Sequence, residues 1–134
     1  MNTYFIDTSF IIALINQKDE YHSWALELSE SLAGSQYITS DLVLYEIGNY
    51  LAKDYKTEAI RTINLLLNSP DIQIIWNSKD LFNQAFEKYS TYADKKWGLV
   101  DCLSFLIMDL NNIQKALTID HHFEQAGFTL MKTI

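Results

Sequence analysis

Short apolar runs alternate with longer amphipathic stretches along this chain. The short runs are rich in β-branched and aromatic residues, which is typical of strands, whereas the longer stretches repeat their apolar residues with the period of a helix. We expect strands at residues 3–6, 36–39, 72–76, 115–119 and around 128–131. We expect helices at residues 7–16, 19–33, 40–55, 57–67, 78–92 and 99–110, and a short helical turn at residues 121–126.

The order of these elements, with helices between successive strands, predicts an α/β fold. Such βαβ units build a mainly parallel sheet that helices cover on both faces. Ligands of parallel sheets bind beyond the carboxyl ends of the strands. Asp7 directly follows the strand at 3–6, and Asp120 directly follows the strand at 115–119. We therefore expect both carboxylates at the same rim of the sheet.

Two further acids lie in otherwise apolar helical segments. Glu46 lies in LVLYEIGNYL, and Asp101 lies near the start of the helix at 99–110, where the helix dipole also favours a negative charge. Removing a carboxylate from water costs several kcal/mol unless a partner or a cation compensates. These two positions therefore predict a compensating group.

Each acid also has an ordinary explanation. Asp7 suits a helix N-cap, Asp120 suits a turn, Asp101 suits a helix start, and Glu46 could be the solvated side of its helix. What favours a common site is the joint placement, with two acids at strand ends and two in apolar helices.

Composition limits the class of protein. The chain has 134 residues, of which 49% are hydrophobic, and it has one proline and four glycines, so we expect a single domain spanning residues 1–134. Its apolar runs are far shorter than the roughly 20 residues of a membrane span, and the start lacks a secretory signal. The one cysteine, Cys102, cannot form an internal disulfide. We expect a cytoplasmic protein with no membrane contact.

The net charge of −7 points away from a protein that grips nucleic acid through a broad basic surface. Four carboxylates gathered around two divalent cations would reduce that charge to −3. The remaining surface would then repel phosphate much less.

Four segments in this order resemble the PIN-domain ribonucleases, and most closely the small VapC-type toxins of toxin–antitoxin systems. The matching segments are an opening strand into DTS at 7–9, the helix with Glu46, LVDCLSF with Asp101, and ALTIDHHFEQAGF with Asp120. The last segment is the most specific, because T-x-D followed by phenylalanine and A-G-F rarely arises from α/β patterning alone. The resemblance spans nearly the whole chain.

The resemblance implies a three-layer α/β/α sandwich and a metal-dependent endoribonuclease. It implies that Asp7, Glu46, Asp101 and Asp120 form the acidic cluster. Clustered carboxylates select hard cations, so we expect Mg²⁺ or Mn²⁺. We expect Asp7, Asp101 and Asp120 to bind the metal directly or through water, and Glu46 either to bind it or to orient the attacking water. The expected partners are an RNA substrate, a small antitoxin and a second copy in a homodimer.

Several polar residues near these acids have two readings. The hydroxyls of Thr8 and Ser9 could hold a carboxylate or a phosphate oxygen, or could simply start a helix. Four lysines are candidates to contact the RNA backbone: Lys53, Lys56, Lys95 and Lys96.

Other polar residues are expected to be ordinary. We expect Asp94 to lie in a solvated loop with its neighbouring lysines. We expect His121 and His122 to be exposed turn residues rather than ligands, because adjacent side chains on a helix do not share a face. His22 and Cys102 are expected to be structural.

Other functions remain open at this point. A receiver-like or flavodoxin-like domain would need an aspartate after a middle strand, and the run at 72–76, taken as that strand, is followed by Asn77. A PIN nuclease of RNA processing that is not a toxin, or a catalytically silent PIN-like interaction module, would share the fold. The tyrosines between Tyr45 and Tyr55 could pack in the core or form a dimer face.

Overall fold

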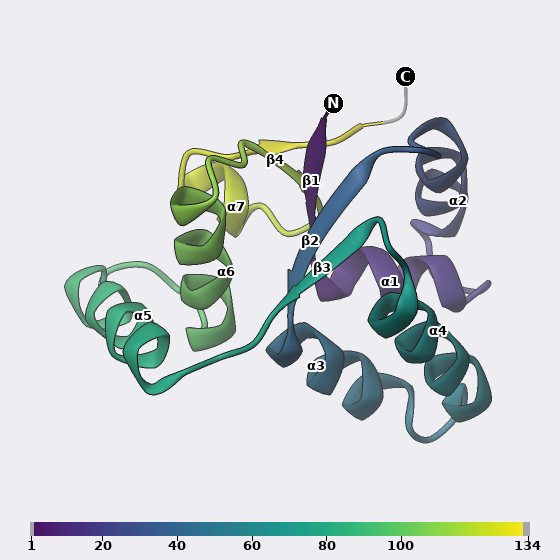
Figure 1. The fold of residues 1–134 in the computed structure, drawn as a ribbon, viewed down its shortest axis with the longest axis horizontal. Coiled ribbons are helices and arrows are strands. Elements are labelled where there is room, and N and C mark those ends of the chain that lie inside the picture. The colour runs from purple at the N-terminus through teal and green to yellow at the C-terminus, as the bar shows by residue number, and fades with distance from the viewer. Residues whose placement is uncertain (1, 133–134) are drawn as a thin grey trace.

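The computed structural model describes residues 2–132, which form a five-stranded sheet covered by helices (Figure 1). The strands are β1 (Thr3–Ile6), β2 (Gln36–Ser40), β3 (Ile72–Ile75), β4 (Lys115–Leu117) and β5 (Thr129–Leu130). The helices are α1 (Thr8–Ile15), α2 (His22–Ser31), α3 (Asp41–Leu51), α4 (Lys56–Asn68), α5 (Lys79–Thr91), α6 (Leu99–Leu110) and α7 (His122–Gln125). The predicted α/β class and the βαβ order are confirmed.

All four strand pairs are parallel, and the strand order is β3-β2-β1-β4-β5. The chain moves outward from β1 through β2 to β3, then crosses to β4 on the other side of β1. Because crossovers between parallel strands are right-handed, this reversal sends the later helices to the opposite face. Figure 1 shows this result, with α1 to α4 on one side of the sheet and α5 to α7 on the other.

The central strand β1 is packed on both of its faces. Tyr4, Phe5 and Ile6 are all buried, which explains why this run has no polar alternation. On one side Phe5 contacts the ring of Phe123, and Phe123 in turn meets Phe105 edge-to-face at a centroid distance of 4.9 Å. The core therefore ties β1 to helices α6 and α7 on the later half of the chain.

Several predicted boundaries were wrong in detail. The helix expected at 40–55 ends at Leu51 and is followed by a turn, because Tyr55 leaves the helix and its hydroxyl donates to Asn16 at 3.0 Å. The helix expected from residue 19 begins at His22, since the side chain of Asp19 accepts the backbone N–H of Tyr21 in a turn. Ser40 is the N-cap of α3, and its side chain accepts the backbone N–H of Val43.

The strand run at 72–76 was taken as a middle strand, and this was wrong because β3 is an edge strand and β1 is central. The residue that follows the central strand is therefore Asp7. The strand expected at 115–119 ends at Leu117, so Thr118 and Ile119 separate it from Asp120. Among residues 2–132, no helix is long and apolar enough to cross a membrane.

Candidate active site

A cavity of about 370 Å³ opens at the rim where β1 and β4 end. The connections from these neighbouring strands run to opposite faces of the sheet, which is where parallel sheets leave a crevice for ligands. All four acids predicted from the sequence line this cavity. Its walls consist of Asp7, Thr8, Ser9, Ile12, Asp19, Glu46, Tyr50, Asp101, Ile119 and Asp120.

Asp7 lies at the turn from β1 into α1, in the N-cap position with extended backbone. Its side chain makes no capping hydrogen bond. The Oδ2 atom instead accepts hydrogen bonds from Ser9 Oγ at 2.9 Å and from Thr118 Oγ1 at 2.7 Å. The helix start supplies the position of Asp7, while the hydroxyls fix its orientation.

The same two hydroxyls join the ends of β1 and β4. The backbone N–H of Ile119 donates to Ser9 Oγ at 3.2 Å, and that of Asp120 donates to Thr118 Oγ1 at 3.0 Å. Ser9 and Thr118 are themselves 3.1 Å apart. The loop that carries Asp120 is therefore held against the start of α1, although Asp120 is two residues beyond the strand.

Glu46 approaches the cavity from α3 and is half-buried. Thr8 Oγ1 donates a hydrogen bond to its Oε1 atom at 2.5 Å. Thr8 and Ser9, which the sequence offered as possible holders of a carboxylate, each hold one. The side chain of Glu46 thus faces the cavity and not the solvated side of its helix.

Asp101 lies in the first turn of α6, where its Oδ2 atom accepts the backbone N–H of Gly98 at 3.0 Å. This bond is the helix-start role expected for it. The Nδ1 atom of His122 also lies 3.2 Å from Oδ2 of Asp101 and 3.3 Å from Oδ1 of Asp120. One imidazole therefore bridges two of the four carboxylates.

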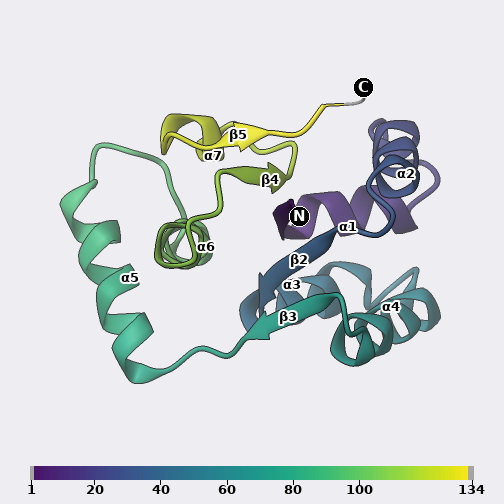
Figure 2. The same ribbon diagram turned by 45° about the horizontal axis from the view of Figure 1, so that its top comes forward.

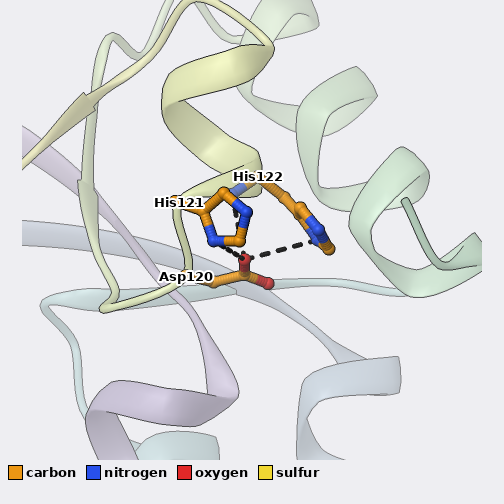
Figure 3. Close-up of side chains that lie close together, drawn as sticks. All are labelled: Asp120, His121 and His122. Carbon is orange, nitrogen blue, oxygen red and sulfur yellow. Dashed lines mark hydrogen bonds and ion pairs between the residues drawn. The ribbon is translucent and has the colours of Figure 1, made fainter. Parts of the chain in front are cut away.

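The expectation that both histidines are exposed turn residues was wrong for His122. The side chain of His121 is 71% exposed, but that of His122 is 20% exposed and lies against Asp101. Figure 3 shows that both rings turn toward Asp120, and their centroids lie 4.7 Å apart. The expectation that these adjacent side chains point to different faces was also wrong, because a nitrogen of each ring and a carboxylate oxygen of Asp120 lie within 4.8 Å of one another.

Burial and mutual repulsion disturb the titration of two of these acids. Burial raises the pKa of Asp7 from its ordinary 3.8 to about 6; the hydrogen bonds from Thr118 and Ser9 oppose this rise, and the charge of Asp101 adds to it. Burial also raises the pKa of Asp101, with a further contribution from Asp120, while the Gly98 N–H and His122 lower it. A cation in the cavity would relieve both effects.

The predicted lysines lie outside this cavity. Lys53 is in the turn after α3 and Lys56 starts α4, whereas Lys95 and Lys96 precede α6 and line a separate hollow. Lys95 is paired with exposed Asp94 at 3.4 Å, in keeping with the expected solvated loop.

Sequence reasoning missed several residues of the site. Asp19 and Tyr50 line the cavity, and Thr118 and His122 hold its acids. The spacing between Glu46 and Tyr50, one helical turn on the same face, could have pointed to Tyr50. Thr118 was visible in the T-x-D segment, where it was used for the resemblance and not for chemistry.

Comparisons with known proteins agree with this geometry. The family model described as the PIN domain matches residues 4–129. A 23S rRNA-specific endonuclease, VapC20 of Mycobacterium tuberculosis, is 32% identical over 124 residues, covering 92% of this chain and 94% of the relative. The crystal structure of M. tuberculosis VapC20, described as a sarcin–ricin loop cleaving toxin, superposes with a TM-score of 0.87 at 29% identity, covering 96% of this chain and 98% of that one.

More distant structures share the fold. VapBC2 from Rickettsia felis, bound to a DNA fragment from its promoter, matches with a TM-score of 0.68 at 18% identity, covering 96% of this chain and 97% of that one. Taken with the family match over nearly the whole chain and the four acids gathered at the rim of a parallel sheet, these findings establish that the chain belongs to the PIN-domain family.

Proposed function

We propose that this protein is a metal-dependent endoribonuclease and the toxin of a toxin–antitoxin pair. The observation that carries the proposal is the convergence of Asp7, Glu46, Asp101 and Asp120 on one cavity at the rim of the sheet. The likeness to VapC20, an rRNA-specific endonuclease, supports RNA as the substrate class. A ribonuclease of this kind would act in the cytoplasm.

The donor set fits a hard divalent cation, Mg²⁺ or Mn²⁺. Within residues 2–132, the hydrogen bonds to Asp7 and Asp101 fall on Oδ2, and the bond to Glu46 falls on Oε1. Each of these carboxylates therefore has a second oxygen for a cation, and oxygen ligands suit Mg²⁺ and Mn²⁺. Burial, with a smaller contribution from neighbouring carboxylates, raises the pKa values of Asp7 and Asp101, and such an ion would stabilise their charged forms.

We assign the binding of the cation to Asp7, Asp101 and Asp120, directly or through water. Glu46, anchored by Thr8, is either a further ligand or the acceptor that orients the attacking water. When bound, the cation supplies positive charge at the phosphate and lowers the pKa of a water molecule. The chain contributes the positions: Ser9 and Thr118 hold Asp7, and His122 holds Asp101 and Asp120 in register.

The direct test is cleavage of a labelled RNA hairpin by the purified protein with Mg²⁺ or Mn²⁺. Asp7→Asn and Asp101→Asn should each abolish cleavage. Asp109→Asn is the matched control, because Asp109 is an exposed acid farther along α6, and it should cleave like the wild type. Equal cleavage by the wild type and Asp7→Asn would overturn the assignment of the site.

We further propose that an antitoxin docks in an apolar groove of about 220 Å³ between α1, α2 and α4. Its lining includes Phe10, Leu14 and the exposed Leu65. A short apolar segment of an antitoxin suits such a groove. Co-expression with the product of an adjacent gene should relieve growth arrest, and Leu65→Glu should restore the arrest. Arrest that co-expression does not relieve would contradict this partner.

A second copy is the proposed occupant of the outer face of α5. Phe82, Phe86 and Tyr89 are exposed there at helical spacing, with stacked rings 6.0 and 6.4 Å apart. Figure 2 shows α5 at the outer edge of the molecule beside α6. Exposed aromatic side chains in a row are typical of association surfaces, so we expect a homodimer through this face.

A further inference from the structure

Tyr50 is a large aromatic residue at the mouth of an acidic cavity. It follows Glu46 by one turn of α3 and lines the same cavity as Asp7, Asp101 and Asp120. Its side chain is nevertheless 73% exposed, so it contributes little to the core. Figure 1 shows α3 beyond the end of β2, and the exposure of Tyr50 in the lining of the cavity places it at the entrance to the site.

Because the cavity is negatively charged, an uncharged contact between the protein and a nucleic acid would strengthen binding there. Five of the residues that line it are carboxylates, namely Asp7, Asp19, Glu46, Asp101 and Asp120, and none is a lysine or arginine. One or two divalent cations would leave this lining close to neutral or still negative. Attraction between the protein and the phosphates is therefore weak at this point, and a contact to another part of the nucleotide is needed.

We propose that Tyr50 is a stacking platform for an unpaired nucleobase beside the scissile phosphate. The inference rests on the proposed ribonuclease function and adds a residue that contacts the substrate. Every base has a flat π-face, so stacking on an exposed tyrosine selects unpaired nucleotides with little regard to their sequence. A base inside a duplex is already stacked and would have to leave its helix first. Tyr50 would therefore contact a nucleotide that is unpaired at the cleavage point.

The chain offers a matched control. Tyr45 lies on the same helix and is 68% exposed, but it is not part of the cavity lining. A general effect of removing an exposed tyrosine from α3 would appear in both Tyr45→Ala and Tyr50→Ala. An effect of stacking would appear in Tyr50→Ala alone, and Tyr50→Phe would retain function because it keeps the ring.

A binding experiment tests the contact without cleavage. An RNA hairpin carrying 2-aminopurine in its unpaired loop is titrated with Asp7→Asn protein in the presence of Mg²⁺. Stacking of the fluorescent base on Tyr50 should quench its emission, and the added Tyr50→Ala change should remove the quenching and weaken binding by about 5- to 150-fold. The added Tyr45→Ala change should alter neither. Equal quenching with and without the Tyr50 ring would overturn the inference.

A cleavage experiment separates this inference from the proposed function. With the cut position in the hairpin mapped, the nucleotides on each side are replaced in turn by abasic residues. Wild-type protein should cleave one of the two abasic RNAs more slowly than the intact RNA. Tyr50→Ala should cleave the intact RNA slowly, and it should cleave that abasic RNA at the same slow rate. If the wild type cleaves and Tyr50→Ala cleaves equally well, the stacking role is wrong and the nuclease stands. If the wild type cleaves no RNA with either metal, both are wrong.

Discussion

Thr118 and Asp7 are joined by a buried hydrogen bond of 2.7 Å across 111 positions of the sequence. The bond links the end of β4 to the end of the central strand, and it falls on a carboxylate whose pKa is raised by burial. A hydroxyl that donates to a carboxylate favours its charged form. Thr118 therefore keeps Asp7 both in place and closer to the ionised state that a cation requires.

Thr118→Val should lower metal-dependent cleavage, with little change in the volume of the side chain at this position. Valine has nearly the same volume as threonine but cannot donate a hydrogen bond, so the pKa of Asp7 should rise further and the metal affinity should fall by about tenfold or more. The measurement is the Mg²⁺ concentration for half-maximal cleavage. Thr91→Val, at the exposed end of α5, is the control and should match the wild type.

Asp7→Asn should abolish cleavage but should raise the free energy of unfolding of the metal-free protein. A carboxyl whose folded pKa lies above its unfolded value makes the folded state bind the extra proton, so the contribution of Asp7 to the free energy of unfolding is most favourable below pH 3.8 and is lost as pH rises through about 6. Above that pH the folded protein carries a cost of about 3 kcal/mol at most. Urea unfolding in EDTA at pH 7.5 should show the asparagine variant to be more stable. A less stable variant would contradict the assigned pKa.

The pH dependence of metal binding should follow the same carboxyl. A cation competes with the proton on Asp7, so at limiting Mg²⁺ the binding should strengthen as pH rises through about 6 and then level off. Isothermal titration of the wild type between pH 5 and 8 measures this directly. The Asp7→Asn variant should bind more weakly and should lose most of the dependence on pH in this range.

His122→Ala should raise the metal requirement, whereas His121→Ala should not. The imidazole of His122 contacts both Asp101 and Asp120, and losing such a support typically weakens metal binding by about 10- to 100-fold. His121 is exposed and lies 4.0 Å from Asp120, so it serves as the matched control. An equal effect of both substitutions would show that His122 has no special role in positioning.

Phe86→Lys should convert the proposed homodimer into a monomer. A charge placed between Phe82 and Tyr89 interrupts the aromatic face of α5 without disturbing the core, because all three side chains are exposed. Light scattering coupled to gel filtration gives the mass in solution. Gln84→Lys, on the same helix and also exposed, is the control and should remain dimeric. A wild type that is monomeric at tens of micromolar would contradict the dimer.

The sequence pattern predicted the elements well and the contacts between them poorly. Residues 3–6 could be recognised as a strand because β1 is buried on both faces and carries no polar alternation. The period of α6 was less informative, since Leu110 is exposed whereas Cys102 and Ser104 are fully buried. This helix packs against α5 and against α7, so a single apolar stripe does not describe it.

The four acids could be predicted because each stood out in its local context or matched the family segments. The groups that hold them could not be predicted in the same way. Thr118, Ser9 and Thr8 act through hydroxyl bonds that span up to 111 positions, and ordinary helix and turn preferences explain such residues equally well. The inward position of His122 depends on where α7 packs against α6, which periodicity does not encode.

The central position of β1 in the sheet affects when the site can form during synthesis of the chain. Asp7 comes early in the chain, but its partner Thr118 and the fourth acid, Asp120, follow about 110 residues later. At a synthesis rate of about 5–20 residues per second, Asp120 is added to the chain roughly 6 to 20 seconds after Asp7. During that interval β1 can pair with β2 but not with β4. Until β4 docks, Asp7 and Asp120 cannot line one cavity, so a chain that is still being synthesised has no complete acidic site.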